Sequence, residues 1–220
     1  RQHNAGRQTI RERIDMLLDS GSFHEMGAAA GVAERDNDGT LQSFTPANFV
    51  LGFGEIAGRR CVVGGEDFTL RGGSPNESGL RKSIYAEDMA CRYRVPLIRM
   101  HEGGGGSVTG AGGKTVGNSP STPPRFRSVA RALATEETAQ VLIAGPAVVE
   151  RALREKKTKE ELGGAQVHTR NGVVDNLAKD EEDALAQVRT FLSYLPQNVW
   201  ELPPRIDPMD DPDRQDEALL

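Results

Sequence analysis

The spacing of apolar and polar residues predicts a helix followed by paired strands in the first seventy positions. Residues 7–19 place isoleucine and leucine three and four positions apart with charged residues between them, which is typical of an amphipathic helix. Residues 31–46 are polar and rich in turn formers, so we expect turns there. Residues 49–70 predict two strands joined by a turn at 57–59.

The next elements follow one order: a loop of small residues, a helix, a strand and a second loop. Residues 72–74 form the first loop, residues 79–94 predict a helix, and residues 96–100 predict a short buried strand. The glycine-rich residues 101–115 follow that strand. Helices between short strands that lead on in the same direction indicate βαβ crossovers and an α/β fold.

The middle of the chain predicts further helices and one strand. Residues 125–134 have helical spacing, and residues 140–145 are typical of a strand. Residues 146–153 predict a helix with proline in its first turn, where proline is tolerated. A Thr-x-x-Glu capping box at 158–161 predicts a short helix that ends at a glycine pair.

The last regular element is a long amphipathic helix over residues 180–195, with acidic residues in the first turn, where the helix dipole favours them. Residues 201–220 are rich in proline and acid and contain few apolar side chains, which predicts a linker. The expected apolar face of the helix consists of Ala184, Val188, Phe191, Leu192 and Leu195.

Length and charge restrict the class of protein. The 220 residues are enough for one large domain with a core. The formal net charge of −5 argues against general binding to nucleic acid or to an anionic membrane, because both need a basic surface.

The two cysteines have neither a disulfide framework nor metal-ligand spacing, so we expect both to be reduced and structural. Reduced cysteines are typical of an intracellular protein, and no apolar stretch in the sequence is near the length of a membrane span.

The glycine-rich residues 101–115 end in Gly-Lys-Thr but match no nucleotide-binding motif. A P-loop needs glycine at the position of Val108, and the dinucleotide fingerprint G-x-G-x-x-G fails from every start in the stretch. What remains is a run of exposed backbone amides. Without a Cβ, such a backbone approaches a ligand closely and turns two N–H groups onto one oxygen.

Two glycine loops that each follow a strand would bring several amide donors to the edge of one sheet. Fixed donors suit a developing oxyanion, where each contributes roughly 3 to 4 kcal/mol. Neither a Ser-His-acid order nor an H-E-x-x-H motif accompanies them in the sequence. An enolate, formed by proton loss beside a thioester carbonyl, is one anion that needs little more than an oxyanion hole made of such amide donors.

Six consecutive blocks of the sequence resemble the carboxyltransferase β subunit of biotin-dependent acyl-CoA carboxylases. This family includes the propionyl-CoA, acetyl-CoA and methylcrotonyl-CoA enzymes. The blocks follow the family's order along the chain, and together they are more specific than any single motif. They are residues 7–27, 65–74, 96–107, 143–153, 158–196 and 207–220.

The resemblance implies a crotonase-like (ClpP/crotonase) α/β fold, a superhelix of ββα units, with two such halves in a full subunit. Residues 1–202 correspond to the N-terminal, acyl-CoA-binding domain, and residues 203–220 to a linker toward an absent C-terminal domain. The junction between Thr135 and Glu136 lacks a family segment that contains a strand and a glycine-rich loop. Because deletion of a central strand would uncover the core, we expect that residues are missing from the sequence at this junction.

In the family, a carboxyl group passes from carboxybiotin to the α-carbon of an acyl-CoA through an enolate. The resemblance places the enolate-holding pair at Gly104 and Gly105, although the family loop Asp-Ser-Gly-Gly-Ala-Arg is replaced by Glu-Gly-Gly-Gly-Gly-Ser. The biotin anion removes the α-proton in this mechanism, so we expect neither a side-chain base nor a metal. The loop beside the CoA path corresponds to Arg71, Gly72, Gly73 and Ser74.

The resemblance also implies partners and a location. Carboxybiotin would arrive on a biotin carboxyl carrier that a biotin carboxylase subunit has charged. The chain would belong to a homo-oligomer, a hexamer of two stacked trimeric rings, in the cytoplasm or, in a eukaryote, the mitochondrial matrix. We expect contact with neither nucleic acid nor membrane.

Two alternatives remain open for the whole chain. A biotin-dependent decarboxylase would run the transfer in reverse, and a non-catalytic assembly module would keep the scaffold without the reaction. Arg81 and Lys82 flank the first glycine loop and could meet CoA phosphates, and His101 could help to shape the site. For these three side chains, and for Lys114 and His168, we nevertheless expect solvated or structural roles.

Overall fold

The structure is a computed structural model that describes residues 2–74, 76–103, 133–136, 138–203, 205, 211 and 213–216. Its elements in chain order are η1 (His3–Ala5), α1 (Ile10–Leu17), β1 (His24–Glu25), β2 (Gly31–Arg35), β3 (Leu41–Pro46), β4 (Phe49–Ile56), β5 (Arg59–Glu66), η2 (Arg71–Gly73), α2 (Glu77–Tyr93), β6 (Leu97–Met100), β7 (Leu133–Thr135), α3 (Pro146–Leu153), α4 (Lys159–Gly163), α5 (Ala165–Arg170), β8 (Asn176–Ala178) and α6 (Glu181–Ser193).

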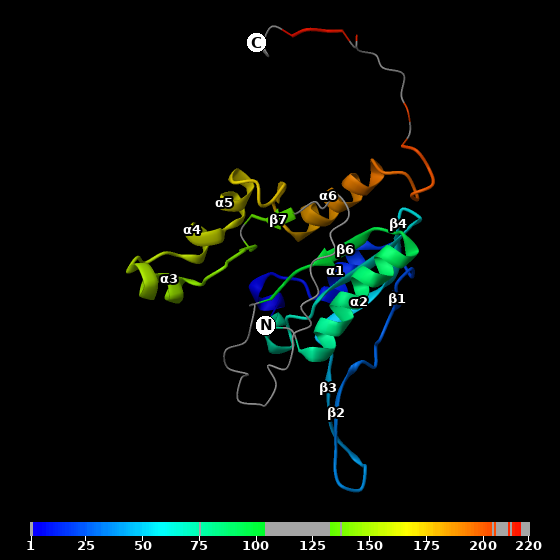
Figure 1. The fold of residues 1–220 in the computed structure, drawn as a ribbon, viewed down its shortest axis with the longest axis vertical. Coiled ribbons are helices and arrows are strands. Elements are labelled where there is room, and N and C mark those ends of the chain that lie inside the picture. The colour runs from blue at the N-terminus through cyan, green and yellow to red at the C-terminus, as the bar shows by residue number, and fades with distance from the viewer. Residues whose placement is uncertain are drawn as a thin grey trace.

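A four-stranded sheet in the order β1-β4-β5-β6 forms the centre of the described part (Figure 1). Strand β4 is antiparallel to both β1 and β5, and β5 is parallel to β6. Ala57 and Gly58 make the turn between β4 and β5 with φ of +51° and +71°, which a two-residue hairpin turn requires. Helix α2 connects β5 to the parallel strand β6, so the predicted βαβ crossover is confirmed.

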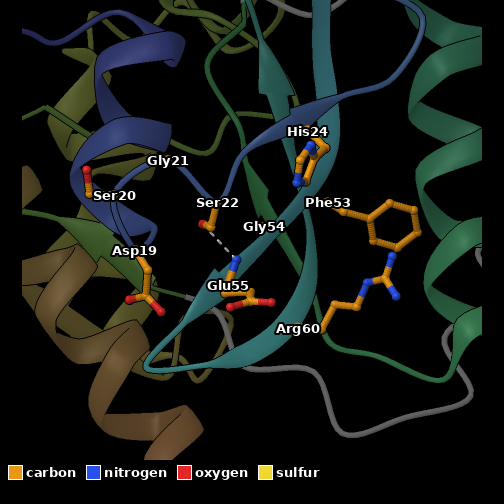
Figure 2. A pocket seen from close by; sticks show the side chains of 9 residues that line it. All are labelled: Asp19, Ser20, Gly21, Ser22, His24, Phe53, Gly54, Glu55 and Arg60. Carbon is orange, nitrogen blue, oxygen red and sulfur yellow. Dashed lines mark hydrogen bonds between the residues drawn. The ribbon is translucent and has the colours of Figure 1, made fainter.

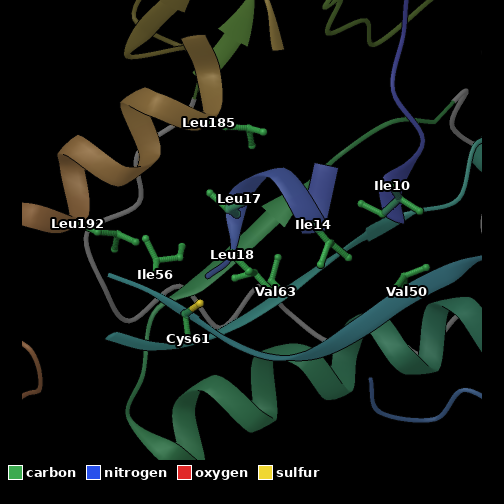
Figure 3. Close-up of a cluster of buried hydrophobic side chains, with 10 residues drawn as sticks. All are labelled: Ile10, Ile14, Leu17, Leu18, Val50, Ile56, Cys61, Val63, Leu185 and Leu192. Carbon is green, nitrogen blue, oxygen red and sulfur yellow. The ribbon is translucent and has the colours of Figure 1, made fainter. Parts of the chain in front are cut away.

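The two faces of this sheet are covered by different helices, because successive residues of a strand point to opposite sides. Phe49, Leu51 and Phe53 of β4 pack with α2, whereas Val50 and Ile56 pack with α1 and α6. Figure 3 shows the second group, in which side chains from α1, β4, β5 and α6 converge. The core therefore holds α1 and α6 on one face of the sheet and α2 on the other.

The prediction of turns over residues 31–46 was wrong, because these residues form the β2–β3 hairpin with Gly31 opposite Pro46. Its turn is held by the Asp36 carboxylate, which accepts hydrogen bonds from the amides of Asp38 (3.1 Å) and Thr40 (2.8 Å). All of β3 and most of β2 are exposed, and the hairpin projects away from the central sheet (Figure 1). Without a buried face, these strands lack the alternation of apolar residues that identifies a strand in a sequence.

Two predictions between residues 125 and 145 were also wrong in the described part. Residues 133 and 134 belong to β7, not to a helix, and β7 runs parallel to β8 up to the 135/136 junction. Residues 140–145 form no strand; Gln140 makes an isolated bridge to Gly164, and the side chain of Ile143 is fully exposed. An apolar run becomes a strand only beside a partner strand, and periodicity does not reveal that partner.

Local signals in the same half were reliable. Helix α3 has the predicted bounds, with Pro146 as its first residue. The capping box is present at the start of α4: the amide of Thr158 donates to the Glu161 carboxylate (2.8 Å), and the amide of Glu161 donates to the Thr158 hydroxyl (3.2 Å). Both signals depend on residues within one helical turn, so they do not depend on the rest of the fold.

Helix α6 was predicted correctly, but its buried face is rotated slightly from the predicted one. Val188 and Leu192 pack against the core as expected. Leu185 is buried there instead of Ala184, and Leu195 is exposed. The face that α6 buries is the one that meets α1, and the position of α1 is set by its own packing on the sheet (Figure 3).

Candidate functional site

The two glycine loops lie in contact at one edge of the central sheet. The first loop follows β5 and the second follows β6, and these parallel neighbours end at the same edge. A Cβ added to Gly73 would lie 2.0 Å from the carbonyl oxygen of Glu102 and 2.8 Å from the Cα of Gly103. The prediction that both loops reach one sheet edge is therefore confirmed for their described residues.

The first loop is a sharp turn made by three residues in the left-handed region. Arg71, Gly72 and Gly73 have φ of +55°, +61° and +71°. Glycine adopts this conformation without strain, whereas arginine does so at some cost. The turn brings the backbone of Gly73 against the second loop, and among the described residues no neighbouring atom lies within 4 Å of the place where a Cβ on Gly72 would be.

Asn48, which directly precedes β4, holds the end of the first loop through hydrogen bonds of its side chain. Its side chain is almost fully buried and donates from Nδ2 to the carbonyl oxygen of Ser74 (2.5 Å). Its Oδ1 accepts a hydrogen bond from the amide of Asn76 (3.1 Å). A buried amide with its donor and acceptor both engaged fixes the backbone that directly follows the turn.

The second loop is held at Glu102. The carboxylate of Glu102 accepts hydrogen bonds from Gln2 Nε2 (2.9 Å) and from Arg13 Nη1, and Arg7 Nη1 lies 3.5 Å away. The backbone amide of Glu102 donates to Glu66 Oε2 (3.2 Å). Both the side chain and the backbone of Glu102 are thus fixed where the loop begins.

Glu66 ends β5 between the two loops. Its carboxylate lies 3.3 Å from His101 Nδ1 and 3.6 Å from Arg99 Nη2. Burial alone would raise the pKa of Glu66, but the hydrogen bond from His101 and the electrostatic interactions with His101 and Arg99 outweigh burial and lower the pKa below its ordinary value. Glu66 therefore carries a negative charge at neutral pH and acts as an anchor for the second loop.

A small cavity of about 70 Å³ lies beside the first loop, between β4 and the start of α2. Buried polar groups line part of it, and the Nε of Arg99 is buried without a hydrogen-bond partner. The cavity has room for very few water molecules, so it is too small for an organic substrate. Its lining residues are Asn48, Phe49, Glu66, Gly79, Leu80, Ser83 and Arg99.

A larger cavity, about 410 Å³, lies at the opposite end of the β4–β5 hairpin (Figure 2). Two of its polar side chains are engaged in the fold: the Asp19 carboxylate accepts from the amides of Ala57 (3.0 Å) and Gly58 (2.8 Å), and the Ser22 hydroxyl accepts from the amide of Glu55 (3.0 Å). This wide hollow was not expected from the sequence. Because Asp19 and Ser22 serve the hairpin and the cavity is lined by neither glycine loop, we regard the paired glycine loops as the candidate functional site.

The residues predicted from the sequence have different outcomes. Gly104, Gly105 and Lys114 lie outside the described residues. Lys82 is buried, not solvated, and donates to the carbonyl oxygen of Gly27 (3.2 Å), and burial lowers its pKa. Arg81 is exposed beside Glu77 (2.6 Å), as expected.

The two histidines differ in their surroundings. His168 Nε2 lies 2.7 Å from the carbonyl oxygen of Val141, which fits the expected structural role. The side chain of His101 is 65% exposed, and its Nδ1 lies 3.3 Å from the Glu66 carboxylate where the second loop begins. Among the residues that the structure describes, no group of three or more His, Cys, Asp or Glu side chains is arranged to hold a metal ion. Within the same residues, no helix has the length and hydropathy needed to cross a membrane.

Sequence reasoning missed the residues that hold the loops: Asn48, Glu66, Arg13 and Glu102. One signal was available for Arg13. It lies between Ile10, Ile14 and Leu17 on the apolar face of the first helix, and a charge at such a position is costly unless it is paired.

The fold and the touching glycine loops define a crotonase-like α/β protein. The chain belongs to the carboxyl transferase domain family, whose model matches residues 1–116 and 126–220. It is 33% identical over 248 residues to the propionyl-CoA carboxylase beta chain of Roseobacter denitrificans, an alignment that covers 99% of this chain and 48% of the relative. It is 31% identical over 246 residues to the methylmalonyl-CoA decarboxylase subunit alpha of Veillonella parvula, with 100% and 48% covered.

The solved structures agree with the sequence relatives. A transcarboxylase 12S structure, described as a hexamer assembly with methylmalonyl-coenzyme A and methylmalonic acid bound, matches with a TM-score of 0.73 and 28% identity. The match covers 96% of this chain and 46% of that one. The chain thus spans about half the length of the relatives that it matches. The predicted family and the crotonase-like fold are confirmed.

Proposed function

We propose that this chain is the acyl-CoA half of a biotin-dependent carboxyltransferase. The reaction moves a carboxyl group between carboxybiotin and the α-carbon of an acyl-CoA through a thioester enolate. The observation that carries the proposal is the contact of the two glycine loops, where Gly73 has no room for a Cβ beside Glu102 and Gly103. Loops this close, at the end of parallel strands, bring backbone amides from both to one ligand.

The loops have separate roles in this proposal. The amides of Gly104 and Gly105, directly after Gly103, hold the enolate oxygen. Residues 71–74 line the CoA path, since the backbone of Gly72 is open to a ligand and the exposed side chain of Arg71 is available to a phosphate. The open backbone and the arginine both fit an acyl-CoA, whose thioester carbonyl and phosphates need such groups.

The two carboxylates beside the described loops are already engaged, so neither suits a general base. Glu66 is paired with His101 and Arg99, and its pKa is lowered. Glu102 is bonded to Arg13 and Gln2. When bound, biotin supplies the carboxyl group and, as its anion, a base for the α-proton. The chain itself orients the thioester and stabilises the enolate.

A decarboxylase is the second candidate function. The Veillonella relative, 31% identical, is named a methylmalonyl-CoA decarboxylase subunit. Carboxylation and decarboxylation pass through the same enolate, so the same glycine loops serve either direction. The direction then depends on the reactions coupled to the transfer, not on these loops.

The chain's extent and partners are part of the proposal. We infer that residues 1–202 form the acyl-CoA-binding domain and residues 203–220 a linker to a C-terminal half, and that a segment belongs between Thr135 and Glu136. We further infer a biotin carboxyl carrier, a biotin carboxylase subunit and a hexamer, in the cytoplasm or the mitochondrial matrix. The intact mass of the protein from its host is the first measurement: a mass far above 23.8 kDa supports the longer chain, and a mass near 23.8 kDa contradicts it.

Binding and transfer assays on the intact protein from its host test the activity. We expect saturable calorimetric binding of propionyl-CoA and none of ATP, the control ligand. With methylmalonyl-CoA and free biotin, the carboxyl group leaves the α-carbon and joins the biotin nitrogen, and the proton of that nitrogen passes to the α-carbon. The propionyl-CoA formed is measured by chromatography. Gly105→Ala is expected to lower this rate by about 100-fold, because a Cβ obstructs close approach to the amide.

Gly145→Ala is the matched control, because the added Cβ meets no atom within 4 Å and the residue lies outside both loops. Its transfer rate should remain near that of the unmodified protein. Absence of propionyl-CoA binding would contradict the proposal. Binding without transfer would favour the non-catalytic assembly module.

A further inference from the structure

A buried arginine connects three separate segments of the chain next to the glycine loops. Arg13 lies on α1, and only 9% of the residue is exposed. Its Nε and Nη2 donate to the two carboxylate oxygens of Glu181 at the start of α6, at 2.9 and 2.6 Å. Its Nη1 donates to the carboxylate of Glu102 at the start of the second loop. One guanidinium therefore bonds two carboxylates from opposite sides, with a planar group whose geometry is fixed.

Glu102 is fixed through both its carboxylate and its backbone amide. The carboxylate is bonded to Arg13 and Gln2, and the amide donates to Glu66 (3.2 Å). Its carbonyl oxygen lies against Gly73, 2.0 Å from the place of a Cβ. A shift of the Glu102 side chain would therefore move the backbone that contacts the first loop.

The charge of Arg13 is stable in this place. Burial alone would lower the pKa of Arg13, but the hydrogen bonds with Glu181 and the negative charges of Glu102 and Glu181 outweigh burial and raise it. The arginine stays protonated at every pH at which the protein folds. Its removal would leave two carboxylates close together in a poorly solvated place.

We propose that Arg13 is a positioning residue for the carboxyl transfer: by holding Glu102, it fixes Glu102 and Gly103 against Gly73 and so aligns the two glycine loops. The inference rests on the proposed function. Arg13 does not touch the reacting atoms. It acts through Glu102, whereas its ion pair with Glu181 joins α1 to α6.

The two ion pairs of Arg13, with Glu102 and with Glu181, can be removed separately by mutation. Glu102→Gln removes the charge at the loop and keeps the size of the side chain. Glu181→Gln removes the charge at α6, leaves Glu102 in place and serves as the matched control. If Arg13 served stability alone, both variants would lower the melting temperature and leave kcat unchanged. If Arg13 positions the loop, Glu102→Gln and Arg13→Gln change the kinetics, whereas Glu181→Gln mainly changes stability.

Transfer from methylmalonyl-CoA to free biotin by the intact protein is measured well below each melting temperature. For Arg13→Gln and Glu102→Gln we expect kcat to fall by about ten- to a hundred-fold, because a small displacement of reacting groups has an effect of this size. We expect KM for the acyl-CoA to change by less than about three-fold, since the loss belongs to the transition state. Arg13→Lys should recover part of kcat, because it keeps the charge but not the planar geometry.

Amide hydrogen exchange of residues 71–74 and 97–103 provides a readout that needs no activity. Faster exchange there in Arg13→Gln and Glu102→Gln, but not in Glu181→Gln, is expected. Unchanged exchange together with an unchanged kcat would overturn the inference. If the unmodified protein transfers no carboxyl group, the proposed function fails, and the exchange pattern alone then decides whether Arg13 aligns the loops.

Discussion

At the scale of single residues, neighbouring glycines of the first loop differ in what they allow. Gly72 and Gly73 both have positive φ, at +61° and +71°. Within the part of the chain that the structure describes, a Cβ on Gly72 would meet no neighbour within 4 Å, whereas a Cβ on Gly73 would meet the backbone of Glu102. The first glycine leaves the backbone open to a ligand, and the second makes room for the other loop.

We expect Gly73→Ala to lower the free energy of unfolding by about 1 to 3 kcal/mol more than Gly72→Ala does, because only Gly73 faces a backbone atom that cannot move away freely. Both variants carry a similar cost for an L-residue with positive φ. Urea denaturation of the two variants measures the difference. Equal losses would show that the loops are not in contact.

At the scale of elements, helix α1 brings Arg13 to the loops while its apolar side chains enter the core. Ile10, Ile14 and Leu17 are buried on the sheet, and Arg13 shares their face. The start of the helix is fixed by a capping box in which the amide of Thr9 donates to the Glu12 carboxylate (2.7 Å). The direction of the helix, and with it the place of Arg13, depends on both the cap and the packing.

We expect Thr9→Ala to lower the free energy of unfolding by about 1 kcal/mol, since the hydroxyl that accepts from the Glu12 amide is lost. Thr9→Ser keeps this hydroxyl and is the matched control. Thermal melting followed by circular dichroism measures both. A loss of the same size in Thr9→Ser would contradict the role of the cap.

At the scale of the whole molecule, carboxylates bonded in the folded state bind protons more weakly than free ones. The pKa of Glu12 falls to about 2 through hydrogen bonds with Thr9 and His3, and hydrogen bonds with Arg11 lower that of Glu25. The pKa of Glu66 is also lowered. A lowered folded-state pKa stabilises the protein above the ordinary carboxylate pKa, and this contribution disappears as the pH falls through the folded-state value.

We therefore expect the melting temperature to be nearly constant from pH 7 to about 5 and to fall between about pH 4.5 and 2, where these carboxylates become protonated. Scanning calorimetry across this range measures the change. Glu66→Gln is expected to have a lower melting temperature at pH 7 and a smaller fall with acid. A melting temperature that rises with acid would contradict the sign of these shifts.

The sequence alone determined the features that depend on neighbours along the chain. Helix α3 and the turn at Ala57 and Gly58 were predicted because proline, glycine and apolar spacing act within a few residues. The meeting of the two glycine loops was predictable as well, because consecutive parallel strands end at one edge of the sheet. The resemblance of the sequence blocks also identified the family correctly.

Only the tertiary structure decided which remote residues meet. The strand β7 depends on β8, which lies about forty positions later, so local helical spacing at residues 125–134 gave the wrong element. Arg13 reaches Glu102 and Glu181 across sequence separations of 89 and 168 residues, and local spacing does not specify such partners. Packing of α1 and α6 on one face of the sheet brings these charges together, because burial of their apolar faces leaves one arrangement for both helices.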